Sequence, residues 1–366
     1  MQINELWKNL DLSSINPFRR NEGFIALDIG SSSIKMVEVE VEKNGYRLLN
    51  MGIQPIPATA IQNNMVADKE VVVKAIRNLV KTQNVKSNQV IAAVPGRVAI
   101  IKKIQLPTQS DEELDANVEF QASQLIPDTL ENVNLDYQAL GYLDNSSDKI
   151  DVLLVAVKKD IINSYTQAIK EAELEPAIVD IDYFAMENMF EINYEPENTG
   201  VVGLVHIGAR YTSINVLRRG LSAFTGDLPV GGESFTEALV HALQLSYDQA
   251  EALKVSGGSD PKKQAEVEKL LKPTADYLAS EISRTLSLYR AMAEEGGIHK
   301  IYLSGGGART PGLSRIIADR LNVDVELIDP FRGFTIARGI DADQLADSAA
   351  ALAVGAGLAV RRPGDK

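Results

Sequence analysis

The sequence contains no cysteine, and its 366 residues include only three histidines. Without cysteine the chain has no disulfide framework, no thiolate metal site and no thiol nucleophile. The three histidines, His206, His241 and His299, are scattered along the sequence, which argues against a zinc site. The missing cysteines are compatible with a reducing compartment.

An excess of positive charge and a long hydrophobic run are also missing. The formal net charge is −13, which argues against a nucleic-acid partner and against direct electrostatic binding to an anionic membrane, since both need a basic surface. No run approaches the roughly 18 to 20 apolar residues of a membrane span, and the N-terminus lacks a basic-then-apolar signal sequence. We therefore expect a cytoplasmic protein.

The composition and length are those of a soluble protein of about two domains. Residues 1–23 stand apart, because Ile3, Leu6, Trp7 and Leu10 have helical spacing. This arm could dock on a membrane surface or partner through the only tryptophan. The simpler interpretation, which we prefer, is a helix laid on its own domain or a frayed end.

The segment from Phe24 to Val41 predicts a β-hairpin with a polar turn. An apolar strand leads into Gly30, Ser31, Ser32 and Ser33, and the strand pattern resumes with Lys35 two residues further on. Backbone N–H groups, hydroxyls and a glycine free to adopt positive φ make this turn a candidate anion site. The alternative is an ordinary Gly-Ser turn.

The same pattern returns at residues 201–217, where an apolar strand, a glycine turn and an apolar return strand follow one another. Two such hairpins half a chain apart suggest duplicated lobes that face one ligand. A third glycine-rich turn, Ser304 to Gly307, follows a buried strand. We expect helices at 69–83, 110–125, 160–172, 233–243, 248–255 and 349–360, and a long helical region that ends at 295. Further strands are expected at 46–53, 90–94, 98–104, 133–140, 149–157 and 301–303.

These glycine turns fit neither of the common nucleotide motifs. No G-x-x-x-x-G-K-[ST] sequence occurs, and Thr310 and Val360 occupy the third glycine positions of the two nearest G-x-G-x-x-G candidates. The sequence therefore supports neither a P-loop NTPase nor a Rossmann dehydrogenase.

From Gly23 to Val360 the chain resembles the actin, hexokinase and heat-shock ATPase superfamily and, within it, the PilM family of type IV pilus assembly. Asp28-x-Gly30-Ser31 with Lys35 is similar to the first phosphate hairpin of that superfamily, and His206-Ile207-Gly208 with Thr212 to the second. The other matching segments are the adenosine turn Ser304-Gly305-Gly306-Gly307 with Pro311-Gly312, the ribose and base contact Ala250-Glu251-x-x-Lys254, and the insert markers Leu106-Pro107, Glu119, Ile126-Pro127 and Asp136-Tyr137, shared with the division protein FtsA.

The resemblance implies an α/β, two-lobed actin-like ATPase fold with an inserted α+β subdomain of the FtsA and PilM type. The expected N-terminal arm covers 1–23. The first lobe comprises 24–96 with 179–199 and 345–362, the insert 97–178, and the second lobe 200–344. Asp180 is expected in the segment that connects the lobes.

ATP or ADP with Mg²⁺ is the implied ligand. Asp28 would hold a hydrated Mg²⁺, Lys35 would add a charge near the phosphates, and Glu251 would accept from the ribose hydroxyls. From the sequence alone, Glu251 and Lys254 could equally form an exposed i,i+3 ion pair. The full expected nucleotide site is Asp28, Gly30, Ser31, Ser32, Ser33, Lys35, Gly208, Ala209, Thr212, Gly231, Gly232, Glu251, Lys254, Ser304, Gly305, Gly306, Gly307 and Arg309.

One position departs from the superfamily pattern. His206 stands where the second hairpin usually carries an aspartate, and an imidazole cannot supply the negative charge that helps to hold a Mg²⁺-bound water and to orient the attacking water. We therefore expect nucleotide binding with at most weak ATPase activity. We interpret the histidine as a tolerated substitution rather than a new catalytic base.

The PilM resemblance also implies a role. It predicts a cytoplasmic ATP-binding scaffold that binds the cytoplasmic N-terminus of PilN between the first lobe and the insert, reaches the inner membrane only through partners, and links that complex to the pilus motor ATPases. Self-association is a further expectation. The alternatives are an FtsA-like polymer-forming division or segregation protein, which usually carries a membrane helix after the last glycine-rich helix, and a small-molecule kinase, which needs a carboxylate at His206.

Overall fold

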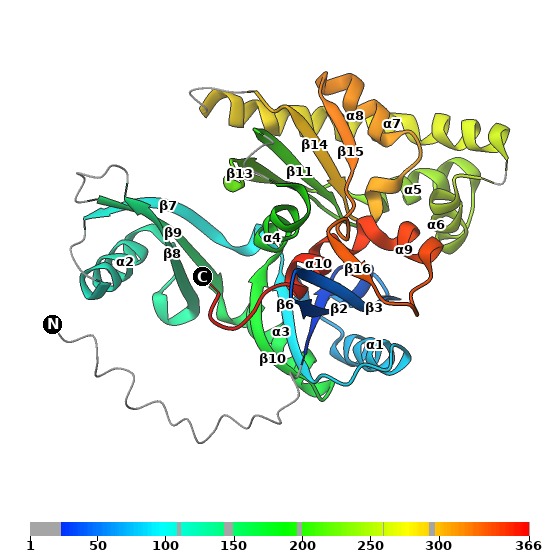
Figure 1. Ribbon diagram of the computed structural model, residues 1–366. Coiled ribbons are helices and arrows are strands. Elements are labelled where there is room, and N and C mark those ends of the chain that lie inside the picture. Colours follow the sequence, from blue (N-terminus) through cyan, green and yellow to red (C-terminus); the bar gives the residue numbers. More distant parts are fainter. Residues whose placement is uncertain are drawn as a thin grey trace.

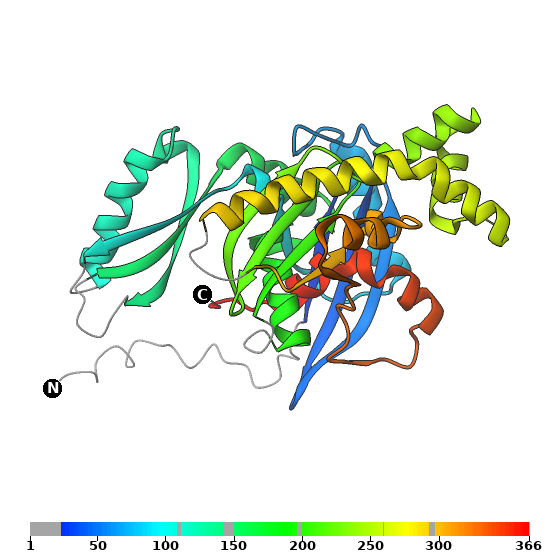
Figure 2. The ribbon, with the colours of Figure 1, turned by 90° about the horizontal axis from the view of Figure 1, so that it is seen from above.

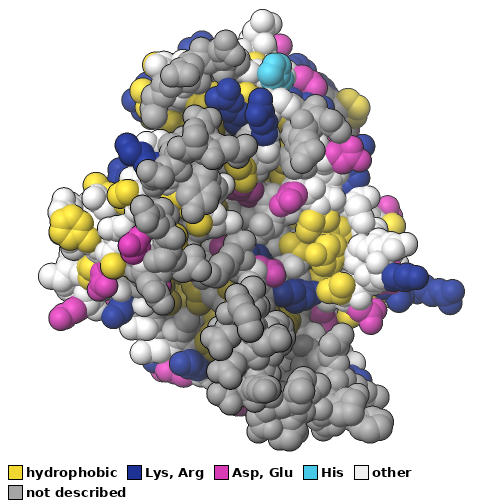
Figure 3. Space-filling model, turned by 60° about the vertical axis from the view of Figure 1, so that its left-hand side comes forward, with side chains coloured by type: hydrophobic (Ala, Val, Ile, Leu, Met, Phe, Trp, Pro, Cys, Tyr) yellow, Lys and Arg dark blue, Asp and Glu magenta, His cyan; other side chains and the backbone are white. Residues whose placement is uncertain are grey.

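The computed structural model describes residues 23–107, 111–142, 149–195, 200–258, 260–292 and 297–365, so the predicted N-terminal arm lies almost wholly outside the described residues. Within this part, three sheets of three or more strands organise the chain (Figure 1). No helix of the described part is long and apolar enough to cross a membrane. On the face shown in Figure 3, basic side chains are scattered among acidic ones rather than gathered in one broad patch.

The first sheet has six strands in the order β10-β6-β1-β2-β3-β16. Helices α1 and α3 pack on one face, and α4 and α10 pack on the other. Because both faces are covered, β1 is almost wholly apolar. The bounds are β1 Phe24–Ile29, β2 Ser33–Glu42, β3 Gly45–Pro55, β6 Gln89–Val94, β10 Glu175–Ile181, β16 Phe334–Ile336, α1 Lys69–Thr82, α3 Lys159–Glu171, α4 Asp182–Tyr194 and α10 Ala353–Ala359; the short pair β4 Ile61–Gln62 and β5 Met65–Val66 lies beside them.

The second sheet has five strands in the order β13-β12-β11-β14-β15. This order repeats that of β3-β2-β1-β6-β10, with the same antiparallel hairpin and parallel neighbour, as the duplication predicted from the two hairpins requires. The bounds are β11 Val201–Ile207, β12 Thr212–Arg218, β13 Leu221–Leu228, β14 Lys300–Ser304, β15 Asp324–Leu327, α5 Gly232–Leu243, α6 Tyr247–Ser256, α7 Pro261–Met292, α8 Leu313–Leu321 and α9 Ala342–Ser348.

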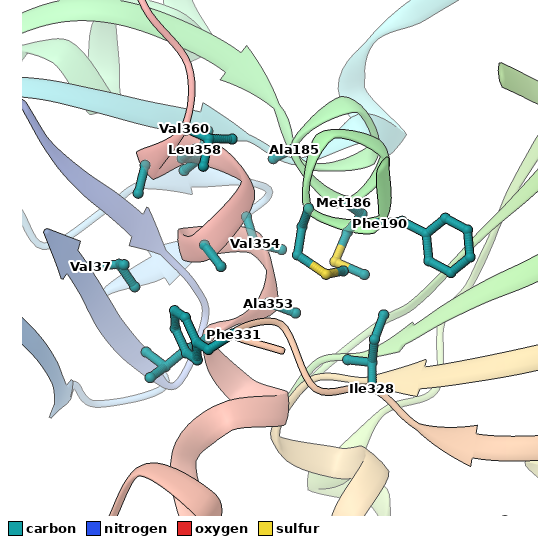
Figure 4. Packing of buried hydrophobic residues seen from close by; sticks show 14 of the residues in the cluster. Val37, Ala185, Met186, Phe190, Ile328, Phe331, Ala353, Val354, Leu358 and Val360 are labelled. Atoms are coloured by element: carbon teal, nitrogen blue, oxygen red, sulfur yellow. The ribbon is translucent and has the colours of Figure 1, made fainter. Parts of the chain in front are cut away.

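Helices α4 and α10 form the layer between the two sheets. Met186 and Phe190 of α4 share one buried cluster with Val37 of the first sheet and with Leu204 of the second, and Val354 of α10 belongs to it (Figure 4). On the far face of the second sheet, the stripe predicted in α7 is buried. The predicted helix at 349–360 begins as a 3-10 turn at Ala349–Leu352 before α10.

The third sheet, β7-β9-β8, stands apart from the other two with helix α2 (Figures 1 and 2). Its bounds are β7 Ile100–Pro107, α2 Asp111–Leu125, β8 Val133–Tyr142 and β9 Lys149–Lys158. Leu114 and Val118 of α2 pack with Val152 and Leu154 of β9 in a separate core. Helix α3 and strand β10, which fall mainly within the predicted bounds of the insert, instead pack on the first sheet. Residues 334–336, which fall within the predicted bounds of the second lobe, form β16 and pair with β3.

Candidate functional site

A cleft lies where the turns of the two hairpins face each other. It encloses about 860 Å³ of space, including its open mouth. Its lining comes from both hairpins, the end of β6, helix α3 and the start of α4. The lining residues are Asp28, Ile29, Gly30, Ser31, Ser32, Lys35, Ile61, Asn63, Asn64, Ala93, Val94, Pro95, Arg97, Tyr165, Asp182, His206, Gly208, Ala209, Arg210, Tyr211, Ser213 and Val354.

The two hairpin turns close in the same way. The Gly30 N–H donates to the Ser33 carbonyl at 3.1 Å, and the Gly208 N–H donates to the Tyr211 carbonyl at 2.9 Å. Two residues before each glycine, Asp28 is the penultimate residue of β1 and His206 is the penultimate residue of β11. The structure thus brings the two predicted hairpins to one cleft, with a carboxylate in one and an imidazole in the other.

Gly30 leaves room for the Lys35 side chain and has no positive φ, which corrects the expectation from the sequence. It is not among the glycines in the left-handed region. A Cβ at this position would lie 2.8 Å from Lys35 Nζ. The glycine therefore lets the lysine side chain fold back over the turn.

Lys35 forms an ion pair with Asp28. Lys35 Nζ lies 3.2 Å from Asp28 Oδ2, and the two side chains are 14 and 15% exposed. The strand register places the residues opposite each other in β1 and β2. Among the described residues, no group of three histidines or acids could hold a metal. The donors present therefore fit a hydrated Mg²⁺ on one or two carboxylates, and not an all-protein cage.

His206 is a neutral imidazole at neutral pH. Burial, partly opposed by the Asp28 charge and reinforced by the Lys35 charge, lowers its pKa to about 4. Its Nδ1 lies 3.0 Å from Ser304 Oγ, which ties the second hairpin to the glycine-rich turn. The side chain that replaces the usual aspartate adds no charge to the cleft.

Asp182, the first residue of α4, lines the cleft although its sequence context did not single it out. Its carboxylate accepts from the Gly96 N–H at 2.7 Å. Burial raises the pKa of Asp182 to about 7, and the charges of Asp227 and Asp28 act in the same direction. Asp180, which was expected from the sequence in the segment connecting the lobes, does not line the cleft. It is buried, and its Oδ2 lies 3.1 Å from Nε of Arg361. The start of a helix was the signal that could have identified Asp182.

Two arginines of the cleft were also not predicted from the sequence. The Arg97 guanidinium lies over the Tyr211 ring at 3.4 Å. Arg210 donates to the carbonyl of Ile61 at 2.6 Å and to that of Ala58. These contacts join the second hairpin to segments of the first half. Each arginine contacts residues that are distant in the sequence, so no local motif could predict these contacts.

The three glycines after β14 have different surroundings. Gly305 has φ of +86°, and a Cβ there would lie 2.3 Å from the Ile207 carbonyl oxygen. A Cβ on Gly307 would lie 2.5 Å from Ile207 Cγ2, whereas one on Gly306 would meet nothing within 4 Å. Gly305 and Gly307 therefore pack against the second hairpin, and of the three only Gly306 has an open approach.

Several predicted site residues support the second hairpin and are not in the cleft lining. Thr212 is buried and donates to the Val230 carbonyl at 2.8 Å. The Gly232 N–H donates to the Gly208 carbonyl at 2.8 Å, and a Cβ on Gly231 would lie 2.5 Å from the Ala209 oxygen. Arg309 forms an ion pair with Asp347 of α9 at 2.6 Å.

Lys254 and Glu251 form an ion pair, but the lysine is buried, in contrast to the exposed pair considered from the sequence. Lys254 is 6% exposed. Its Nζ donates to the Gly232 carbonyl at 3.0 Å, to Thr236 Oγ1 at 2.9 Å and to Glu251 Oε2 at 2.7 Å. All three ammonium protons are thus used. The bonds to Gly232 and Thr236 join α6 to α5, and the bond to Glu251 lies within α6. Glu251, with 40% of its side chain exposed, retains a solvent-facing part.

Comparison with known proteins places this geometry in a family. The model of the type IV pilus assembly protein PilM family matches residues 26–363. The structure of a PilM–PilN type IV pilus biogenesis complex is similar with a TM-score of 0.80 and 26% identity, covering 93% of this chain and 98% of that one.

Two further relatives share the architecture. FtsA of Bacillus subtilis is 21% identical over 352 residues, covering 85% of this chain and 79% of FtsA. The ethanolamine utilization protein EutJ of Carboxydothermus hydrogenoformans has a TM-score of 0.57 at 16% identity, covering 92 and 88% of the two chains. The fold is therefore the predicted actin-like α/β fold, with duplicated halves and the α+β insert. Because the family model spans nearly the whole sequence, the chain belongs to the PilM family of type IV pilus assembly proteins.

Proposed function

We propose that the chain is a nucleotide-binding scaffold of type IV pilus assembly, with ATP or ADP in the cleft between the two hairpins. The observation that carries this proposal is the meeting of Asp28, Lys35 and His206 at one cleft built by duplicated hairpins. The turn of Gly30, Ser31 and Ser32 receives the phosphates, and Lys35 neutralises part of their charge. The adenosine lies toward Gly306 and Glu251.

Asp28 holds a hydrated Mg²⁺, which needs only one or two protein carboxylates. The ion neutralises phosphate charge when it is bound. His206 leaves the opposite side of the cleft without a second negative group, since its imidazole is neutral. Nucleotide therefore binds with at most slow hydrolysis, and the bound state rather than turnover is the functional output.

The partner we propose is the cytoplasmic N-terminal segment of a PilN protein, held between the first lobe and the insert. The support is the similar PilM structure, which is a complex with PilN. Through this segment the chain reaches the inner membrane, and through its other surfaces it meets the pilus motor. A ligand shifts a protein between arrangements only if its affinity differs between them, so nucleotide acts by favouring the partner-binding arrangement.

The test is capture of a peptide with the PilN N-terminal sequence, with retained nucleotide measured in the same samples. We expect Asp28→Ala to lose nucleotide and to capture less peptide. Asp319→Ala, which changes an exposed carboxylate of α8, is the matched control and should behave as wild type. If wild-type protein did not bind nucleotide, the proposed ligand would be wrong. If its affinity for the peptide were the same with and without ATP, nucleotide binding would not be coupled to peptide binding.

The FtsA relatives favour a second candidate, an FtsA-like polymer-forming protein. Sedimentation with and without ATP separates the two functions. The scaffold proposal predicts that the chain stays in the supernatant at concentrations that saturate the PilN peptide. ATP-dependent pelleting without peptide binding would favour the polymer.

A further inference from the structure

Tyr165 of α3 presents a hydroxyl that the proposed phosphate and nucleoside contacts do not use. The residue is 0% exposed and belongs to the core between α3 and the first sheet, yet it also lines the cleft. Its Oη is buried and has no hydrogen-bond partner among the described residues. Tyr165 therefore brings to the cleft a buried hydroxyl that no described protein group satisfies.

A buried hydroxyl in this state is costly. Leaving such a group unpaired costs about 1 to 3 kcal/mol, whereas phenylalanine would fill the same space without that cost. Native proteins contain few such groups, and a bound ion or an ordered water often satisfies those that occur. An unpaired Oη within a ligand cleft thus points to a polar occupant beside it.

The surrounding charges favour a cation and its waters over a phosphate. Burial and the charges of Asp28 and Asp182 raise the pKa of Tyr165 above its ordinary value, so the phenol keeps its proton and does not ligate a metal as phenolate. The carboxyl groups of Asp28 and Asp182 line the same cleft as Tyr165. Lys35 is paired with Asp28, and His206 is neutral. Lys35, Arg97 and Arg210 also line the cleft, but the charges that act on Tyr165 come from Asp28 and Asp182. The surroundings of its hydroxyl therefore suit the hydrogen-bond-donating waters of a hydrated cation.

We propose that Tyr165 Oη accepts a hydrogen bond from a water ligand of the Mg²⁺ held by Asp28, and so positions the hydrated ion. Tyr165 is a positioning residue that acts through that water, with Asp182 as a further acceptor for the same hydration shell. This inference rests on the proposed nucleotide function.

The test measures ADP affinity by calorimetry in Mg²⁺ and in EDTA for wild type and Tyr165→Phe. We expect the variant to lose about fivefold to tenfold of the Mg²⁺-dependent gain in affinity, the value of one hydrogen bond, and to match wild type in EDTA. Tyr289→Phe is the matched control, because Tyr289 Oη of α7 is also buried and unpaired among the described residues but lies outside the cleft lining. It should leave both affinities unchanged.

The ligand-free melting temperature provides the second readout. Both substitutions remove an unpaired hydroxyl, so neither should lower it. Three results would overturn the water contact while nucleotide binding stands. They are a Tyr165→Phe variant with the wild-type gain in ADP affinity from Mg²⁺, a wild type whose ADP affinity does not rise with Mg²⁺, and a variant that loses equal affinity in Mg²⁺ and in EDTA. A wild type that binds no ADP in either buffer would overturn the proposed function itself.

Discussion

The imidazole of His206 occupies in the second hairpin the place of Asp28 in the first. Each is the penultimate residue of a buried strand, two positions before the glycine of its turn. The Asp28 carboxylate is charged and paired with Lys35, whereas burial holds the pKa of His206 at about 4. The same backbone arrangement therefore presents one negative group and one neutral group to the cleft.

We expect wild-type protein to release phosphate from ATP more slowly than once a minute, and His206→Asp to release it faster. The new carboxylate can orient an attacking water, and a positioned acid–base group contributes about a hundredfold or more in other enzymes. His206→Asn is the control, since it changes the shape without adding charge. Phosphate release by wild type at many turnovers per minute would contradict the prediction.

Residues whose environment is set by the local chain could be predicted from the sequence. Asp28, Gly30 and Lys35 lie within eight residues, and the hairpin brings them together through its own register. Arg97 and Tyr165 could not be found this way, because their cleft partners come from other elements. Thr212 was predicted to contact the nucleotide, but its hydroxyl points into the protein and donates to the Val230 carbonyl.

At the scale of elements, helix α10 depends on glycine for its contact with α4. A Cβ on Gly357 would lie 1.7 Å from the Ala185 carbonyl oxygen, and one on Gly355 would lie 2.9 Å from Val37 Cγ2. The two glycines let α10 fit between the first sheet and α4 (Figure 4). The small residues of this helix thus set the thickness of the layer between the sheets.

Gly357→Ala should destabilise the protein strongly, because the added methyl group requires α10 and α4 to separate. We expect the free energy of unfolding to fall by about 3 kcal/mol, the upper part of the range typical of overpacking. Urea denaturation followed by circular dichroism measures it. Gly339→Ala is the control, because a Cβ there meets nothing within 4 Å. Equal midpoints for the two variants would show that the layer tolerates expansion.

The longer elements follow from periodicity, and the short ones do not. The predicted helix at 69–83 is α1, and the stripe of α7 beginning at Leu278 is buried as expected. Strands β4, β5 and β16 have only two or three residues, too few to show an alternating pattern. Their existence depends on neighbours that local sequence does not specify.

At the scale of the whole molecule, side-chain contacts cross between the halves around the cleft. Arg210 of the second hairpin binds the carbonyl of Ile61, and Arg97 stacks on Tyr211. Tyr183 of α4 donates to Asp227 Oδ2 of β13 at 2.6 Å. The described arrangement is therefore held closed by protein contacts as well as by the shared core.

Arg210→Ala should loosen this closure. Loss of its hydrogen bonds to backbone carbonyls removes about 2 kcal/mol from the closed arrangement, so we expect a larger radius of gyration by X-ray scattering and faster nucleotide release in a stopped-flow chase. Arg315→Ala, which removes an exposed ion pair with Glu268 of α7, is the control. Identical scattering and release for the two variants would rule out a closing role for Arg210.

For the nucleotide proposed above, the ion pair between Asp28 and Lys35 predicts which form enters the cleft. Free phosphate must draw Lys35 away and strand a carboxylate, and a free cation must draw Asp28 away and strand an ammonium group; either leaves an uncompensated, largely buried charge. A nucleotide that arrives already complexed with its cation offers the cation to Asp28 and the phosphate to Lys35 at the same time, so neither side chain loses its partner. We therefore expect the cleft to bind the complex of nucleotide and cation more readily than the free nucleotide or the free cation.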